Sequence, residues 1–220
     1  MGLGSKDRLG TEPPEFDTGS RNVLPPVTPT QPGRESRLVT YADYAALDDG
    51  RRYQVFSGML VAEPAPTTCH QQIVGNLFRI LVSHTEESRA GGVLLLSPVD
   101  VVLDSDGRQI EVLQPDIVWV RRERAAIVQE AAIFGVPDLV VEVLSPSSAR
   151  RDRKHKVQRY CRFGVPHIWL FDPEHRVFEE LVRAEDGCHG SAVVYHDQDA
   201  VKPLCFPQLV LRLSEVWPRS

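Results

Sequence analysis

The chain has 220 residues, a hydrophobic fraction of 42% and a formal net charge of −5. This length suits one sizeable domain. No apolar run approaches the roughly 20 residues of a membrane-spanning helix. The negative net charge gives the protein no general affinity for polyanions. The four cysteines form no C-x-x-C pair and the N-terminus has no signal-peptide pattern, so we expect reduced thiols and a cytoplasmic location.

Residues 1–37 contain six of the seventeen prolines and five of the fifteen glycines, with few large apolar side chains. Such a segment cannot bury enough surface to offset the entropy lost on ordering, so a disordered tail is predicted. The folded domain is predicted over residues 38–220. It begins with a short helix that Thr40 caps and that runs through Ala46.

Residues 52–62 contain two short apolar strands around Ser57 and Gly58, which predicts a β-hairpin. A helix is expected next, with Thr67 or Thr68 as its cap and an end near Arg89. Its apolar face has helical spacing and consists of Ile73, Leu77, Ile80 and Leu81, extended by His70 and His84. His70 is interpreted as a capping or core histidine.

Two strands are predicted at residues 93–103 and 110–120, joined by a turn at 104–107. Asp116 lies on the second strand and shares a face with Gln114, because side chains alternate along a strand. Residues 121–134 favour a short helix whose inward positions are Ile127, Ala131 and Phe134.

Residues 139–144 form an apolar run rich in β-branched side chains, which predicts a buried strand. Glu142 lies within it, and a carboxylate there has a large desolvation cost unless a cation or hydrogen-bond donors meet it. Serines at 145–148 end the strand and can cap the next helix. That helix carries one acid, Asp152, and seven basic residues, Arg150, Arg151, Arg153, Lys154, Lys156, Arg159 and Arg162.

Further strands are predicted at residues 167–171, 176–183, 192–196 and 209–213. The order of elements is a hairpin, a helix, three strands, a helix and a strand, followed by an antiparallel extension. This order predicts an α/β fold with a mixed sheet flanked by helices.

An acid in a buried strand beside a basic helix suggests a metal and phosphate site. If Asp116 lies on the strand next to Glu142, the two carboxylates can converge on Mg²⁺ or Mn²⁺, since hard cations prefer a few protein oxygens completed by water and substrate phosphate. A nuclease also needs a lysine nearby, to position or deprotonate the attacking water and to balance charge. Lys156 can supply it from the helix.

Asp152 and Tyr160 lie one helical turn before and after Lys156, so the three residues share a face. An ion pair between Lys156 and Asp152 is an alternative compatible with a catalytic role. The basic residues suit a solvated face as well as a nucleic-acid contact, for which Arg150 and Arg153 are the candidates.

Five stretches carry a resemblance to a known family: PTTCHQQIVGNL, QPDIVWV, PDLVVEVLSPSS, DRKHKVQRYCRFGVPHIWLFDP and, more weakly, RYQVFSGMLV. Together they make the chain resemble the Uma family of restriction endonucleases, a branch of the PD-(D/E)XK nuclease superfamily. The resemblance implies a restriction-endonuclease-like fold with Asp116 and Glu142 as metal ligands. It also implies that the lysine has moved from the strand position of Leu144 to Lys156, and it suggests a homodimer that cuts two DNA strands.

The chain departs from the family in the first strand, where the family pattern YELIDGEL reads YQVFSGML. Gln54, Ser57 and Met59 replace three acids, and Gln54 retains an amide oxygen that could bind metal or hold a water. From the resemblance as a whole we expect a magnesium-dependent endonuclease that acts on DNA. The alternative is a nuclease-like domain that has lost catalysis and serves as a binding or assembly module.

Overall fold

The computed structural model describes residues 38–88, 91–103, 110–144, 149–187 and 189–218, and the side chains of 149–154 are outside this description. The predicted disordered tail, the turn at 104–107 and the capping serines at 145–148 lie outside it as well. Those three features stay predictions.

The first elements form as predicted from their caps and turn residues. Helix α1 (Tyr41–Ala45) begins with a capping box, in which Thr40 and Asp43 each accept the backbone N–H of the other. Strands β1 (Tyr53–Phe56) and β2 (Met59–Ala62) pair in register around Ser57 and Gly58. Both turn residues have positive φ, 50° and 75°, as the tight turn of a two-residue hairpin requires.

Helix α2 (Thr68–Glu87) begins where the side chain of Thr67 accepts the backbone N–H of His70. It buries one face, made of His70, Ile73, Val74, Leu77 and Leu81. The predicted helix is confirmed, and Val74 widens its apolar face.

The prediction of two long strands over 93–103 and 110–120 is wrong. Each region splits into two strands: β3 (Val93–Leu96) and β4 (Val101–Val102) in the first, β5 (Val112–Leu113) and β6 (Ile117–Val120) in the second. Pro98 and Pro115 stand in the gaps, and proline has no N–H to donate to a strand ladder. As a result, β3 pairs with β6 in one sheet while β4 pairs with β5 in another.

The expected helix over 121–134 is also largely wrong. A 3₁₀ helix, η1 (Arg122–Ile127), is followed by strand β7 (Ile133–Phe134), and Ala131 is exposed. The backbone N–H of Ile133 donates to the carbonyl of Asp100, which begins a parallel pairing with β4. This long-range pairing, which helical spacing cannot reveal, decides the local structure.

Two sheets organise the domain. The five-stranded sheet has the order β2-β1-β5-β4-β7, and the six-stranded sheet has the order β11-β10-β9-β8-β6-β3. The strands not yet introduced are β8 (Leu139–Val143), β9 (His167–Asp172), β10 (Val177–Val182) and β11 (Val193–His196). Strands β8 and β9 are parallel and the other pairs in the six-stranded sheet are antiparallel, so the predicted mixed sheet is confirmed.

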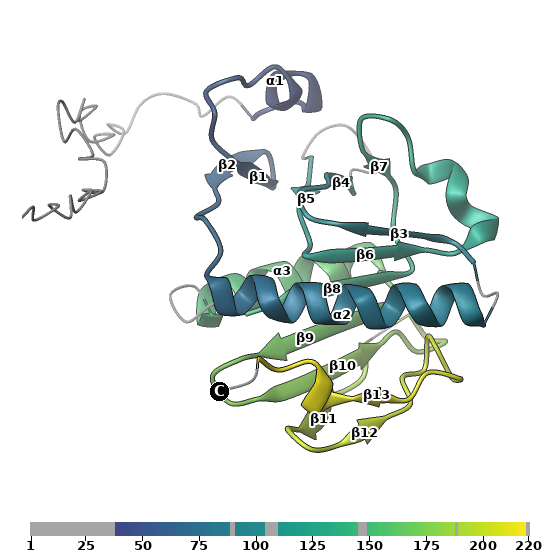
Figure 1. Cartoon of the computed structure of the whole chain (residues 1–220). Coiled ribbons are helices and arrows are strands. Elements are labelled where there is room, and N and C mark those ends of the chain that lie inside the picture. The colour runs from purple at the N-terminus through teal and green to yellow at the C-terminus, as the bar shows by residue number, and fades with distance from the viewer. Residues whose placement is uncertain (1–37, 89–90, 104–109, 145–148, 188, 219–220) are drawn as a thin grey trace, which may run out of the picture. The chain divides into compact units, whose positions relative to one another are not determined.

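Helices cover the six-stranded sheet on both faces (Figure 1). Leu139, Val141 and Val143 of β8 pack in one core with α2, whereas Val140 packs in a second core with Tyr160 of helix α3 (Ala149–Phe163). The C-terminal elements β12 (Ala200–Val201), β13 (Leu211–Arg212) and η2 (Leu213–Glu215) join the α2 side. Among the described helices, none has the length and hydropathy to cross a membrane.

Candidate active site

Glu142 is the centre of a buried polar cluster on the α3 side of the sheet. Its side chain is 8% exposed, its Oε1 accepts a hydrogen bond of 2.6 Å from the Tyr160 hydroxyl, and its Oε2 accepts one of 3.1 Å from Lys156 Nζ. Burial raises the pKa of Glu142 to about 7, the charge of Lys156 opposes the rise, and the charge of Asp116 adds to it. The carboxylate therefore has less positive charge around it than its burial demands.

Lys156 and Tyr160 reach Glu142 from adjacent turns of α3, so the prediction that they share a face is confirmed. Burial lowers the pKa of Lys156, but the charges of Glu142, Glu63 and Asp116 outweigh it, and the pKa rises above 10.5. Lys156 is therefore an ammonium ion at neutral pH. The side chain of Asp152, the third residue of the predicted face, is not among those that the structure describes.

Asp116 stands directly before β6, the strand that pairs with β8 beside Glu142. Its backbone N–H donates to the carbonyl of Val141 at 3.0 Å, and its Oδ2 accepts the backbone N–H of Val143 at 2.7 Å. These bonds fix the carboxylate at the end of β8. The predicted placement of Asp116 beside Glu142 is confirmed.

His70, in the first turn of α2, belongs to the same cluster. Its Nε2 is 3.1 Å from Asp116 Oδ2, and its Nδ1 is buried without a hydrogen-bond partner among the described residues. Burial lowers the pKa of His70, but the hydrogen bond and charge of Asp116 outweigh it and place the pKa above 6.5. The interpretation of His70 as a core histidine at a helix start is confirmed by its burial, and the fold also turns its ring onto Asp116.

Glu63, which follows β2, is an acid of the early hairpin that the sequence comparison missed. Its Oε1 accepts a hydrogen bond from Gln54 Nε2, and its charge raises the pKa of both Lys156 and Tyr160. Gln54 is fully buried, and its Oε1 accepts the backbone N–H of Gln114 at 3.0 Å. The amide oxygen that was expected to bind metal or water is therefore already engaged. The hairpin therefore retains a carboxylate, that of Glu63, nine residues after Gln54.

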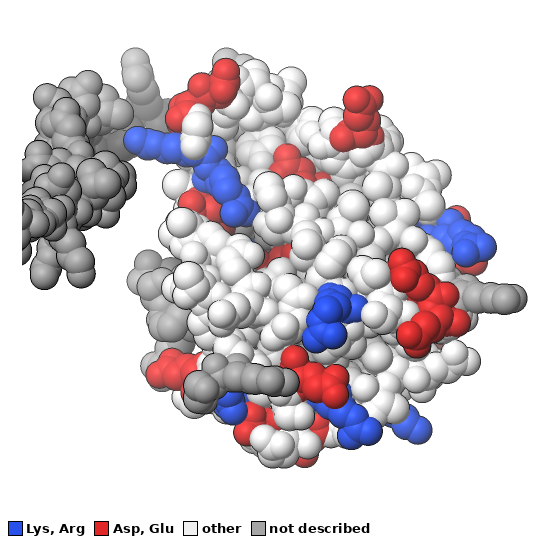
Figure 2. All heavy atoms as spheres, in the orientation of Figure 1, with Lys and Arg blue, Asp and Glu red and all other residues white. Residues whose placement is uncertain are grey.

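The basic residues of α3 do not form a uniform solvated face. Besides Lys156, the described Arg159 also turns inward, where its Nη1 lies 2.8 Å from Oε1 of the buried Glu111, whereas Arg162 is exposed. On the face shown in Figure 2, lysine and arginine side chains are scattered among acidic ones. The side chains of Arg150 and Arg153 lie outside the description, so their contact with nucleic acid stays a prediction.

The aspartate of the Pro137-Asp138 pair has a different role. Asp138 lies at the opposite end of β8 from Glu142, is buried, and accepts hydrogen bonds from Arg121 Nε at 2.7 Å and Arg124 Nη1 at 2.9 Å. These bonds attach η1 and its preceding residue to the sheet. Asp138 is a structural ion-pair partner.

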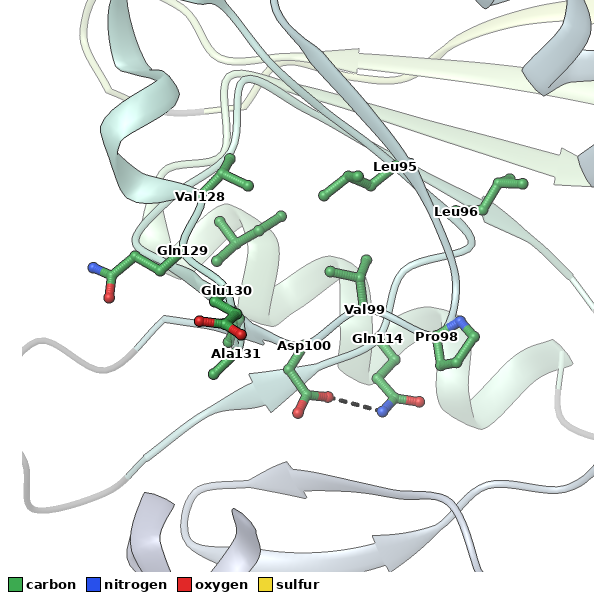
Figure 3. Close-up of a pocket in the computed structure, with 12 residues that line it drawn as sticks. Leu95, Leu96, Pro98, Val99, Asp100, Gln114, Val128, Gln129, Glu130 and Ala131 are labelled. Carbon is green, nitrogen blue, oxygen red and sulfur yellow. Dashed lines mark hydrogen bonds between the residues drawn. The ribbon is translucent and has the colours of Figure 1, made fainter.

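Gln114 also lines a pocket of about 480 Å³ (Figure 3). Leu95, Leu96 and Val99 give it apolar walls, and Gln114 Nε2 donates to Asp100 Oδ1 at 2.8 Å on its polar side. The backbone of the same Gln114 holds Gln54. A ligand in the pocket would therefore lie against a segment that supports the acidic cluster.

A family model named Uma2 and described as "Putative restriction endonuclease" matches residues 40–214. The chain belongs to the Uma2 family. The match includes every residue of the cluster around Glu142. A crystal structure described as "a putative nuclease belonging to DUF820" from Anabaena variabilis is similar with a TM-score of 0.64 and 17% sequence identity, over 81% of this chain and 97% of that chain. This likeness confirms the fold, and no curated protein matches the sequence.

The raised pKa values predict how the stability of this Uma2 domain depends on pH. Glu142 and His70 both hold their protons more tightly in the folded state, so protonation of each group adds to the free energy of unfolding. This stabilisation is fully present below the unfolded pKa values of 4.5 and 6.5. It is lost as pH rises through the folded pKa values, of which that of Glu142 is about 7. We expect the melting temperature of the metal-free protein to fall between pH 5 and pH 8 more steeply than that of Glu142→Gln. Equal slopes in calorimetric scans of the two proteins would contradict the assignment.

Proposed function

We propose that this Uma2 family member is a metal-dependent nuclease that hydrolyses phosphodiester bonds in nucleic acid, with DNA as the expected substrate. The observation that carries the proposal is the position of Glu142. A buried strand carboxylate is held between a lysine and a tyrosine of one helix and lies beside a second carboxylate, Asp116, which directly precedes the neighbouring strand. Perturbed pKa values in such a cluster are typical of functional sites.

The donor set fits Mg²⁺ or Mn²⁺. The charges of three carboxylates, Asp116, Glu142 and Glu63, act on Lys156, and hard oxygen ligands are those that these ions prefer. The raised pKa of Glu142 supports the fit, because a divalent cation would supply the positive charge that the buried carboxylate lacks. When bound, the ion would polarise the phosphate and lower the pKa of a coordinated water. Asp116 and Glu142 are the proposed ligands.

The protein's own residues would divide the remaining tasks. Lys156 is protonated, so it suits the orientation of the attacking water and the balance of negative charge at the phosphate better than removal of a proton. Tyr160 donates to Glu142 and fixes the rotation of its carboxylate. His70 contacts Asp116 in the same way from the other side of the sheet, so we infer that Tyr160 and His70 are positioning residues.

The pocket that Gln114 lines suits a part of the substrate that flanks the scissile phosphate. Its apolar walls can hold a flat ring, and the Gln114–Asp100 pair offers donors and acceptors at one side. Arg150 and Arg153, near the N-terminus of α3, are the proposed contacts to the phosphate backbone. Cleavage of both strands of a duplex would need two sites, and a homodimer stays our expectation for that case.

The alternative function is a nuclease-like binding or assembly module without catalysis. The loss of early acids at Gln54, Ser57 and Met59 favoured it, but Glu63 supplies a carboxylate at that part of the site. This observation favours the enzyme.

A cleavage assay tests the proposal directly. The full chain is incubated with duplex DNA, single-stranded DNA, branched DNA and RNA in Mg²⁺, in Mn²⁺ and in EDTA. We expect cleavage of at least one DNA substrate that EDTA abolishes, together with a rise of the melting temperature in Mg²⁺ or Mn²⁺. Metal-induced stabilisation without cleavage of any substrate would favour the binding module. The absence of both stabilisation and cleavage would reject a metal site at Glu142.

A further inference from the structure

A second group of metal-ligating side chains lies on the opposite face of the six-stranded sheet. His167 is the first residue of β9, Glu180 lies on β10, and Cys205 follows β12 in the segment that leads to β13. One ligand atom of each residue lies within 4.8 Å of those of the other two. Because side chains alternate, His167 shares its face with Trp169, away from the face of Glu142.

Glu180 is a buried carboxylate with only neutral donors around it. Its Oε1 accepts hydrogen bonds from Trp169 Nε1 at 3.2 Å and from the backbone N–H of Leu204 at 3.1 Å. Within the described part of the chain, no lysine, arginine or histidine forms an ion pair with it. Both donors use the same oxygen, which fixes the carboxylate and directs Oε2 elsewhere, as outer hydrogen bonds do for metal ligands.

The other two side chains each offer a soft or borderline donor. His167 Nδ1 is buried and has no hydrogen-bond partner among the described residues, although buried polar atoms normally have one. Burial and the charge of Glu180 raise the pKa of the Cys205 thiol, and the backbone N–H groups of Cys205 and Phe206 oppose the rise. Such N–H groups stabilise a thiolate when a cation is present to complete the charge balance.

We propose that His167, Glu180 and Cys205 bind a Zn²⁺ ion. A thiolate, a carboxylate and a neutral imidazole together carry two negative charges, so the site with zinc is neutral, which suits its burial. Nitrogen, sulfur and carboxylate oxygen are the ligands that zinc prefers, whereas Mg²⁺ takes oxygen alone. His167 and Cys205 are only half-buried, so a water can complete a tetrahedral site. Binding releases the Cys205 proton to solvent.

The ion would fasten the C-terminal segment to the sheet. Its three ligands come from β9, β10 and the segment before β13, and this segment also contributes Phe206 and Leu209 to the core beside α2. A metal that bridges these parts stabilises the folded state only, because the ligands are far apart in the unfolded chain. The site is therefore structural and separate from the proposed nuclease site.

Cobalt provides a direct test, because a cobalt–thiolate bond gives an intense near-ultraviolet charge-transfer absorption. The full chain is stripped of metal under reducing conditions and titrated with Co²⁺. We expect the band to saturate at one equivalent, to disappear when Zn²⁺ displaces the cobalt, and to be absent in Cys205→Ser. We also expect Zn²⁺ to raise the melting temperature by about 5 °C in the wild type and not in the variant.

Matched variants separate this site from other metal binding. Cys161→Ser removes another half-buried cysteine, and Glu142→Gln removes a proposed ligand of the nuclease site, so both should keep the band. His167→Gln leaves the sulfur in place and should keep the band but weaken cobalt affinity at least 10-fold. Circular dichroism checks that each variant is folded. A wild type without the band, or a folded Cys205→Ser variant that retains it, would overturn the proposal.

Discussion

Glu142→Gln is expected to reduce metal-dependent cleavage by a factor on the order of 10³ and to leave the fold intact. The amide keeps the size of the side chain and can still accept the hydroxyl hydrogen of Tyr160, but it loses the charge that a divalent ion and Lys156 require. Asp116→Asn should have a similar effect, because the amide oxygen still accepts the N–H of Val143 while the ligand charge is gone. Single-turnover cleavage in saturating Mn²⁺ measures both effects.

Glu111→Gln is the matched control for this prediction. Glu111 is also a buried glutamate paired with a basic residue of α3, since its Oε1 lies 2.8 Å from Arg159 Nη1 and burial raises its pKa. Its side-chain partners among the described residues, Arg159 and Ser57, are not members of the cluster around Glu142, so its loss should lower stability without a comparable loss of cleavage. Full activity in Glu142→Gln, or an equal loss in both variants, would contradict the assigned site.

Part of the site could be predicted because its residues follow one another along regular elements. Strand alternation gives the face of Glu142, and the helical repeat places Lys156 and Tyr160 one turn apart on the helix that follows. These short-range rules need only the correct assignment of one strand and one helix. Asp116 required one further assumption, the pairing of its strand with β8, which the structure confirms.

The remainder of the cluster depends on tertiary contacts that no local rule specifies. His70 caps no helix and lies on α2, yet the docking of α2 against β8 turns its ring onto Asp116. Arg159 resembles a solvent-exposed basic residue in sequence, but the helix packs it against Glu111. Prolines likewise divided two strands between separate sheets, which a search for apolar runs alone does not detect.

Glu63 shows the same limit, and it leads to the second large expected effect. The family pattern places early acids within the hairpin strands, where this chain has Gln54. The structure instead uses Gln54 as a connector, with its oxygen on the backbone of Gln114 and its nitrogen on the carboxylate of Glu63. The charge of Glu63 in turn raises the pKa of both Lys156 and Tyr160. We infer that Glu63 is the early acid of this site.

Glu63→Gln should therefore lower cleavage at limiting Mg²⁺ by about 10- to 100-fold, with partial recovery at saturating Mg²⁺. The reason is that the site loses one of three negative charges that attract the ion. Cleavage rate against Mg²⁺ concentration measures the change, and the melting temperature checks that the hairpin stays folded. An unchanged metal dependence would show that Glu63 does not contribute to metal binding and acts only as a hydrogen-bond partner of Gln54.

An exchange of the two side chains separates charge from position. Gln54→Glu alone puts a second carboxylate against Glu63 at a fully buried position, so it should lower the free energy of unfolding above pH 6 by about 2 kcal/mol. The double variant Gln54→Glu/Glu63→Gln restores one carboxylate and one amide in hydrogen-bond contact. We expect it to regain wild-type stability and a metal requirement within about 10-fold of the wild type, since the charge still lies beside Lys156. If stability returns but the metal requirement stays that of Glu63→Gln, the carboxylate must occupy position 63 itself, which would make Glu63 a direct ligand of the metal.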